Sequence, residues 1–283
     1  MRKSLELAEG SVSQCVWHAG APLLHFAHAN GFNAETYRGL LSPLAGQFDV
    51  AASDARGHGF TTLPATPGLA HGWTIFRDDL LAVLDSIAPE GAILAGHSMG
   101  ATASLMAAAL RPEKVRALVL VEPVLVPKHV PAGDNELARR AEKRRDQFAS
   151  LEEAFGLYRG RGAFKTWPDE TLRDYLRGGL VPADGGMRLA CRPAWEAQDF
   201  RSTPSGVSEL AGSLRCPVTL IHAADGTASQ SEVAIFKQLY PQTRVVNKEG
   251  ATHFLPMEFP ELVREEILSI ASCPPPRGEV EKL

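Results

Sequence analysis

The segment Gly96-His97-Ser98-Met99-Gly100 has the pattern Gly-x-Ser-x-Gly and lies between two elements of different type. The apolar run 91–95 before it predicts a short buried strand, and the alanine-rich run 101–110 after it predicts a helix. A serine in a sharp turn between a strand and a helix has a strained backbone that projects its hydroxyl from the sheet edge. Glycine on either side lets the strand and the helix approach closely around that turn. We therefore interpret Ser98 as a candidate nucleophile.

The rest of the chain is typical of an α/β protein. Apolar runs alternate with helical patterns, which predicts a mostly parallel, doubly wound sheet covered on both faces. A helix is expected over 73–88, and another begins at Pro260 and ends before the proline run 274–276. Seven strands are expected, at about 12–18, 23–28, 49–53, 92–95, 117–121, 218–222 and 244–247.

The alternation stops between residues 124 and 206, where the sequence predicts helices, most clearly at 136–148 and 151–158. An insertion at this point lies above the carboxyl ends of the strands, where ligands bind in open α/β sheets. We therefore expect a core formed by 1–123 and 207–283, with 124–206 as an inserted helical cap.

Composition excludes several classes of function. The 283 residues carry a net charge of −4 and no basic domain, so nucleic acid is not an expected partner. The segment 1–10 lacks the apolar run of a signal peptide, and no stretch is apolar enough to cross a membrane. The sequence carries no signal of oligomeric state.

The cysteines are scattered and contain no Cys-x-x-Cys pair. They predict reduced, mostly buried thiols and a cytoplasmic protein, although a secreted form with two disulfides stays open. Their positions are Cys15, Cys191, Cys216 and Cys273.

A serine needs a base to remove its proton. Among nine histidines, His253 follows the predicted strand 244–247 in a loop just before the last helix. A loop at the carboxyl end of a parallel strand reaches the sheet edge at which Ser98 is exposed. His253 is therefore the expected general base.

Acyl transfer also needs hydrogen-bond donors for an oxyanion. The expected donors are the amide of Met99, at the start of the helix, and the amide of Phe32, because Gly31 lets that turn bend toward the site. His28 and Asn30 are expected to support the turn, and Gly31 and His97 are also expected to support the site. His25 and His28 do not form a metal pair, since residues three apart on a strand face opposite sides.

Together the segments 28–32, 54–59, 96–100 and 250–253 resemble the α/β-hydrolase superfamily over nearly the whole chain. The resemblance implies a serine hydrolase that uses no metal or organic cofactor and acts on a small acyl substrate. It also implies that His58, in the Arg-Gly-His-Gly turn, is structural. The serine at 98 argues against the dehalogenase and epoxide-hydrolase branches, which use an aspartate there.

The third member of the triad departs from the commoner pattern of this superfamily. In that pattern the acid lies four residues beyond the position of His222, where this chain has Gly226, and the nearest carboxylate is Asp225. The rival is Glu122, 24 residues after Ser98 at the end of the strand 117–121. Some superfamily members take their acid from that strand end. Loop register favours Glu122, and Asp225 is the alternative.

The cap does not identify a substrate. Its aromatic residues either line an acyl pocket or form the cap's own small core, and we favour the core. Its basic run 139–145 is interleaved with acids and is interpreted as a solvated helix face. A hydrolase of carboxylic esters or thioesters, a carbon–carbon bond hydrolase or perhydrolase, and a slow or non-catalytic ligand-binding protein on the same scaffold all stay open. The aromatic residues are Phe148, Phe155, Tyr158, Phe164, Trp167, Tyr175, Trp195 and Phe200.

Overall fold

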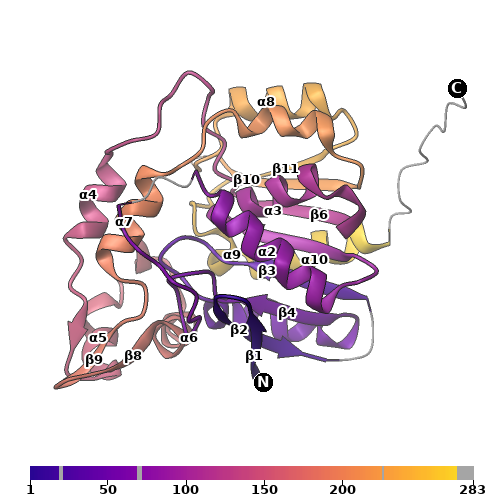
Figure 1. Cartoon of the computed structure of the whole chain (residues 1–283). Helices are drawn as coiled ribbons and strands as arrows, with labels where there is room; N and C mark the ends of the chain where they lie inside the picture. The colour runs from indigo at the N-terminus through magenta and orange to yellow at the C-terminus, as the bar shows by residue number, and fades with distance from the viewer. Residues whose placement is uncertain (19–21, 69–71, 225, 273–283) are drawn as a thin grey trace, which may run out of the picture.

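The computed structural model describes residues 1–18, 22–68, 72–224 and 226–272 (Figure 1). In these residues eight strands form the main sheet, in the order β1-β2-β4-β3-β5-β6-β10-β11. The pairs β1–β2 and β2–β4 are antiparallel, and all the later pairs are parallel. The strands are β1 (Arg2–Leu7), β2 (Gly10–Trp17), β3 (Leu23–Ala27), β4 (Asp49–Ser53), β5 (Ala92–His97), β6 (Val115–Val121), β10 (Val218–Ala223) and β11 (Arg244–Lys248).

Helices cover both faces of this sheet, which explains the continuous apolar runs in the central strands. In β6, for example, Leu118 and Leu120 pack with α2, α3 and α8, whereas Val119 and Val121 pack with α1 and α10. The helices of the core are α1 (Arg38–Leu41), α2 (Thr74–Ile87), α3 (Met99–Leu110), α8 (Gln230–Leu239), α9 (Leu255–Glu258) and α10 (Pro260–Ala271), and the 3₁₀ turns are η1 (Ala34–Tyr37), η2 (Ser42–Gly46), η3 (Pro112–Lys114) and η5 (Val207–Ser213).

All seven predicted strands are present, with ends within two residues of the expected ones, and the mixed α/β architecture is confirmed. The edge strand β1 was not predicted, because its residues alternate between exposed and half-buried and include no fully buried position. The expected helices at 73–88 and from Pro260 correspond to α2 and α10, while the tail 273–283 lies outside the described residues.

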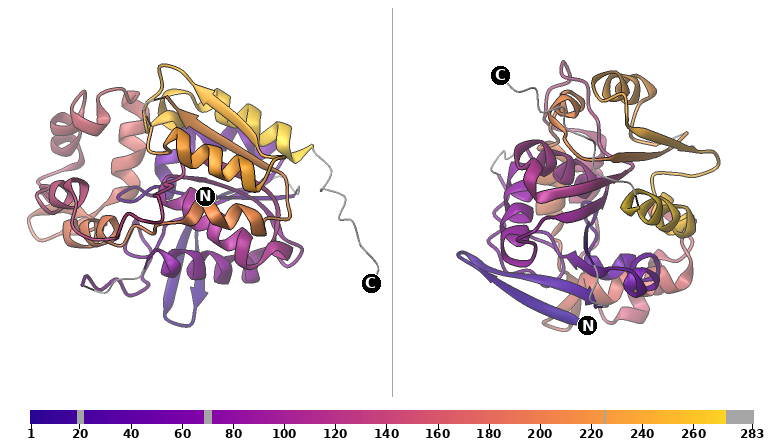
Figure 2. Two further views of the ribbon diagram at one scale, coloured as in Figure 1. Left: turned by 90° about the horizontal axis from the view of Figure 1, so that it is seen from above. Right: turned by 90° about the vertical axis from the view of Figure 1, so that its right-hand side faces the viewer.

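The segment 124–206, which we call the cap segment, lies to one side of the sheet in Figures 1 and 2, and begins where β6 ends. Its predicted helix at 136–148 is too long: α4 ends at Glu142, and the last two residues of the range form a strand. The segment is also not purely helical, since β7, β9 and β8 form a small antiparallel sheet. Its elements are α4 (Glu136–Glu142), β7 (Gln147–Phe148), α5 (Leu151–Tyr158), η4 (Gly162–Phe164), α6 (Asp169–Gly179), β8 (Leu180–Ala183), β9 (Gly186–Leu189) and α7 (Pro193–Arg201).

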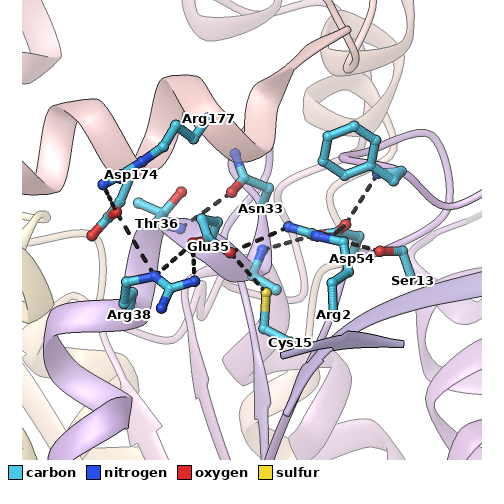
Figure 3. A network of polar contacts seen from close by, with 12 residues as sticks. Arg2, Ser13, Cys15, Asn33, Glu35, Thr36, Arg38, Asp54, Asp174 and Arg177 are labelled. Atoms are coloured by element: carbon cyan, nitrogen blue, oxygen red, sulfur yellow. Dashed lines mark hydrogen bonds and ion pairs between the residues drawn. The ribbon is translucent and has the colours of Figure 1, made fainter. Parts of the chain in front are cut away.

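A polar network joins α6 of the cap segment to the core (Figure 3). Arg38 lies between Glu35, to which its Nε donates at 2.5 Å, and Asp174 of α6, whose Oδ1 is 3.9 Å away. The other oxygen of the Glu35 carboxylate accepts from the Cys15 thiol at 3.0 Å. Asn33 adds a bond from its side-chain amide to the Tyr175 carbonyl at 2.9 Å. The turn η1 thus fixes α6 against the carboxyl side of the sheet.

Cys15, Cys191 and Cys216 are buried free thiols, and Cys273 lies outside the described residues. Within the described ranges no helix is long and apolar enough to cross a membrane. Over the same ranges no group of histidine, cysteine and acidic side chains is arranged to hold a metal ion.

Candidate active site

Ser98 lies at a strained turn between β5 and α3. Its φ of 54° and ψ of −117° fall in a region that residues with a side chain rarely adopt. A Cβ at Gly100 would lie 2.2 Å from the carbonyl oxygen of Ala27, and one at Gly96 would lie 2.6 Å from the Gly100 backbone. Both glycines are therefore required for the close crossing of strand and helix.

His253 reaches Ser98 from the loop after β11. Its Nε2 lies 3.0 Å from Ser98 Oγ, and its Nδ1 lies 3.1 Å from Glu122 Oε2. Because a carboxylate only accepts hydrogen bonds, the proton of the neutral imidazole belongs on Nδ1. Nε2 is then free to accept the Ser98 hydroxyl, as a general base must.

Glu122 is fully buried directly after β6, with a φ of 50°. Its Oε1 accepts the Ala223 amide at 2.5 Å, and its Oε2 accepts the Thr227 amide at 2.9 Å. Burial opposes ionisation, but the bonds from His253 and these two amides outweigh it, so the pKa of Glu122 lies below its ordinary value. The carboxylate is therefore ionised near neutral pH.

The loop after β10 surrounds this carboxylate. A Cβ at Gly226 would lie 2.2 Å from Glu122 Oε2, so the loop has room for the glutamate only because residue 226 is glycine. The hydroxyl of Thr227, which the sequence did not mark as a site residue, lies 3.2 Å from His253 Nδ1. Asp225, the alternative acid, lies outside the described residues.

A chain of hydrogen bonds connects the base to the turn that follows β3. His97 Nε2 donates to the His253 carbonyl at 2.8 Å, which leaves Nδ1 to accept the Tyr37 hydroxyl at 2.8 Å. Tyr37 in turn accepts the Ala29 amide at 3.1 Å. Burial is the largest cause that keeps the pKa of His97 well below its ordinary value, so this histidine stays neutral. His97 thus bonds the backbone of His253 and the Tyr37 hydroxyl, and its supporting role stays a prediction.

The turn 29–32 is closed by its own backbone, since the Phe32 amide donates to the Ala29 carbonyl at 3.1 Å. In this arrangement the Phe32 amide has to share or release that bond to serve an oxyanion. Met99 begins α3, and amides in the first turn of a helix have no partner within the helix. The role of its amide as an oxyanion donor stays a prediction.

Three polar side chains support the same turn. His28 Nε2 accepts the Ala55 amide at 2.8 Å, so its Nδ1 donates to the Ala29 carbonyl of the turn at 2.7 Å. His58 Nε2 accepts the Gly31 amide at 2.9 Å. The side-chain amide of Asn30 donates to the Glu196 carbonyl of α7 at 3.0 Å. Burial lowers the pKa of His58 to about 3, so it acts as a neutral acceptor, consistent with a structural role.

Aromatic side chains of the cap segment pack around Phe32. The ring of Phe32 is 5.2 Å from that of Trp167, 5.7 Å from that of Tyr175 and 6.2 Å from that of Phe254, which follows the base. These cap aromatics thus pack on Phe32 of the turn 29–32 as well as on one another.

Arg144 departs from the solvated face that the sequence indicated. Its Nη1 bonds Glu196 Oε2 at 2.5 Å, and its Nη2 bonds the Tyr175 hydroxyl at 2.7 Å. Arg139 and Arg140 of the same run lie on a solvated face, as the sequence indicated. Arg139 forms an exposed ion pair with Asp134, just before α4, and Arg140 forms one with Glu136 in α4.

Known proteins resemble this chain in sequence. A model of the α/β hydrolase fold matches residues 22–260. The chain is 28% identical over 247 residues to a 2-(acetamidomethylene)succinate hydrolase of Mesorhizobium japonicum, covering 87% of this chain and 86% of that protein. An epoxide hydrolase of Caballeronia sordidicola is 31% identical over a shorter stretch, 41% of this chain and 36% of its own length.

Solved structures extend the likeness over the full fold. The crystal structure of an E-2-(acetamidomethylene)succinate hydrolase superposes with a TM-score of 0.81 at 25% identity, covering 96% of this chain and 99% of that one. The thioesterase domain of the curacin biosynthetic pathway has a TM-score of 0.78 at 21% identity, covering 95% and 99%. The chain belongs to the α/β-hydrolase fold family.

Proposed function

We propose that this protein is a serine hydrolase that cleaves a carboxylic ester or a related acyl substrate through an acyl-enzyme. The observation that carries the proposal is the contact of Ser98, His253 and Glu122, at 3.0 Å and 3.1 Å, on a strained strand–helix turn. Nothing in folding alone requires a serine in that conformation. The relative from Mesorhizobium japonicum, a hydrolase of an acetamido-substituted succinate, supports hydrolysis and extends the candidate bonds to amides.

In the proposed reaction, His253 Nε2 takes the proton of Ser98 as Oγ attacks the acyl carbonyl. The amide of Met99, joined by that of Phe32, stabilises the oxyanion of the tetrahedral intermediate. Collapse expels the leaving group, to which the imidazolium returns the proton. Water then attacks the acyl-enzyme with His253 as the base, and Glu122 holds the imidazole in the required tautomer throughout.

The test is active-site labelling with a fluorophosphonate, alongside turnover of p-nitrophenyl acetate, butyrate and octanoate. Ser98→Ala is expected to remove labelling and turnover while the protein stays folded. Ser104→Ala, in the helix that follows Ser98, is the matched control, because it removes a buried hydroxyl with no partner among the described residues. Labelling and turnover that survive in Ser98→Ala refute the proposal.

Labelling and turnover can also give different results in the wild-type protein. Labelling of Ser98 without turnover of any simple ester points to a more demanding substrate or to blocked deacylation, as expected of a slow enzyme that acts mainly by binding. Neither labelling nor turnover in the folded wild type favours a ligand-binding protein on a hydrolase scaffold.

A further inference from the structure

Arg144 is a cap residue that lies against the oxyanion turn. A Cβ added at Gly31 would be 3.3 Å from its Nη1 and 2.6 Å from the Glu196 carboxylate. Standard bond lengths then place Nη1 within roughly 8 Å of the amide nitrogen of Phe32. The guanidinium is therefore a near neighbour of the backbone that would receive the substrate carbonyl.

The placement of this charge is costly for stability alone. Taking an ion pair out of water has a large desolvation cost, and apolar side chains of similar size often stabilise such a position as well or better. The Arg144 side chain is 21% exposed and that of Glu196 9% exposed, whereas Arg140 of the same basic run is 75% exposed. A charge kept at this depth beside a reaction centre suggests a role in binding.

The guanidinium also retains free binding capacity. Its bonds to the described residues use Nη1 and Nη2, so its Nε–H has no acceptor among them. A guanidinium is a planar fork of five donors that matches the geometry of a carboxylate. Glu196 and Tyr175 hold this fork in place without using all of its donors.

Aromatic side chains lie between Arg144 and His253. Tyr175, which bonds the guanidinium, has its ring 5.7 Å from Phe32, and Phe32 lies 6.2 Å from Phe254 beside the base. Rings at these distances provide an apolar surface for a short carbon chain. A substrate with a carbonyl at one end and an anion at the other matches this sequence of environments.

We infer that Arg144 binds a carboxylate of the substrate, so that the substrates of this site are short acyl compounds, esters or amides, carrying a free carboxylate a few carbons from the scissile carbonyl. The inference rests on the proposed function, since it places the reacting carbonyl at Ser98. The separation of roughly 8 Å at most suits a chain of succinyl or glutaryl size. Glu196 partly neutralises the guanidinium and so limits its affinity for the anion.

The test compares monoethyl succinate with ethyl 4-oxopentanoate, in which a methyl ketone replaces the carboxylate, by pH-stat titration. Wild type is expected to prefer the carboxylated ester at least tenfold in kcat/KM. Arg144→Gln is expected to lower this ratio at least tenfold, mainly through KM. A ratio cancels any loss of activity common to both esters. The matched control is Arg145→Gln, which removes the adjacent, 53% exposed arginine and is expected to keep the wild-type ratio.

A second variant separates binding from structure. Glu196→Gln leaves the guanidinium uncompensated, so the preference for the carboxylated ester is expected to rise. If the pair only holds the cap in place, Glu196→Gln and Arg144→Gln instead lower hydrolysis of both esters and leave the ratio unchanged. That result, or a wild-type ratio near one, overturns the inference.

Failure of the proposed function gives a different pattern. If neither ester shows turnover that depends on Ser98, the hydrolase proposal fails, and the carboxylate site is judged by succinate binding to Ser98→Ala, followed by tryptophan fluorescence. Binding that weakens at least tenfold in Arg144→Gln supports the anion site. Succinate that does not bind, or binds equally to both proteins, overturns it.

Discussion

Replacement of Glu122 by glutamine is the most demanding test of the site, because the structure specifies both oxygens of this carboxylate. Oε1 accepts the Ala223 amide at 2.5 Å, while Oε2 accepts the Thr227 amide at 2.9 Å and faces His253 Nδ1 at 3.1 Å. A glutamine offers one acceptor oxygen and one NH₂ group. Either orientation therefore sets the NH₂ group against a backbone N–H donor.

The two orientations have different costs. With the NH₂ group toward Ala223, the His253 tautomer survives, but a buried donor loses its acceptor, at a cost of about 1–3 kcal/mol in stability. With the NH₂ group toward His253, Nδ1 has to accept, the proton moves to Nε2, and the base can no longer take the proton of Ser98. Loss of the correct tautomer typically lowers kcat about 10⁴-fold. We expect Glu122→Gln to lower kcat by roughly 10³–10⁴ and stability by about 1–3 kcal/mol.

The assay is ester turnover at saturating substrate, together with denaturant unfolding. Glu258→Gln is the matched control, because the Glu258 carboxylate accepts from the Thr252 amide and hydroxyl in the loop that carries His253, at 2.8 Å and 2.7 Å. Its kcat should stay within about threefold of wild type. If Glu122→Gln also retains kcat to within threefold, while Asp225→Asn loses it, the assignment of Glu122 as the acid is wrong.

Two further predictions follow from buried groups. Gly226→Ala is expected to lower kcat roughly 10²-fold by displacing the Glu122 carboxylate, since the added Cβ would lie 2.2 Å from Oε2. Gly212→Ala, where an added Cβ meets nothing within 4 Å, should be silent, and equal activity of the two variants would contradict the role of the glycine. Burial, with a smaller contribution from His28, lowers the pKa of His25 to about 4, so between pH 4 and the ordinary value near 6.5 the unfolded chain binds a proton that the folded chain does not. The free energy of unfolding should therefore fall as the pH drops through this window, by about 3 kcal/mol from this residue. In His25→Leu, denaturant unfolding should show a weaker dependence of that free energy on pH. An unchanged dependence would show that His25 does not titrate in this way.

The core fold was predictable because its signals are local. Strands such as β5 and β6 are buried on both faces, so each reads as a continuous apolar run within a few residues. The serine turn has the same property, since its two glycines directly flank the reactive residue. β1 was not predicted, because its polar, exposed residues form a strand only by pairing with β2.

The cap segment and the acid depend on distant partners. The basic run is interleaved with acids, so Arg144 could not be separated from its neighbours until Glu196, 52 residues later, was seen to bind it. Thr227, whose hydroxyl lies near the base, had no local pattern of its own. Loop register favoured Glu122 over Asp225 but could not show what holds the Glu122 carboxylate, because the amides that bind it lie 101 and 105 residues further along the chain.

The proposed position of the acid agrees with the space available beside His253. The loop after β10 presents two amides, from Ala223 and Thr227, to a single carboxylate, and residue 226 lies against that carboxylate with no room for a side chain. An aspartate at 226, as in the commoner arrangement, would therefore compete for the volume that Glu122 fills. One anion neutralises the imidazolium, whereas two in this volume would repel each other and raise a pKa. A carboxylate at the end of β6 therefore goes together with a glycine at 226, because the imidazolium of His253 needs one neighbouring anion and the space holds only one.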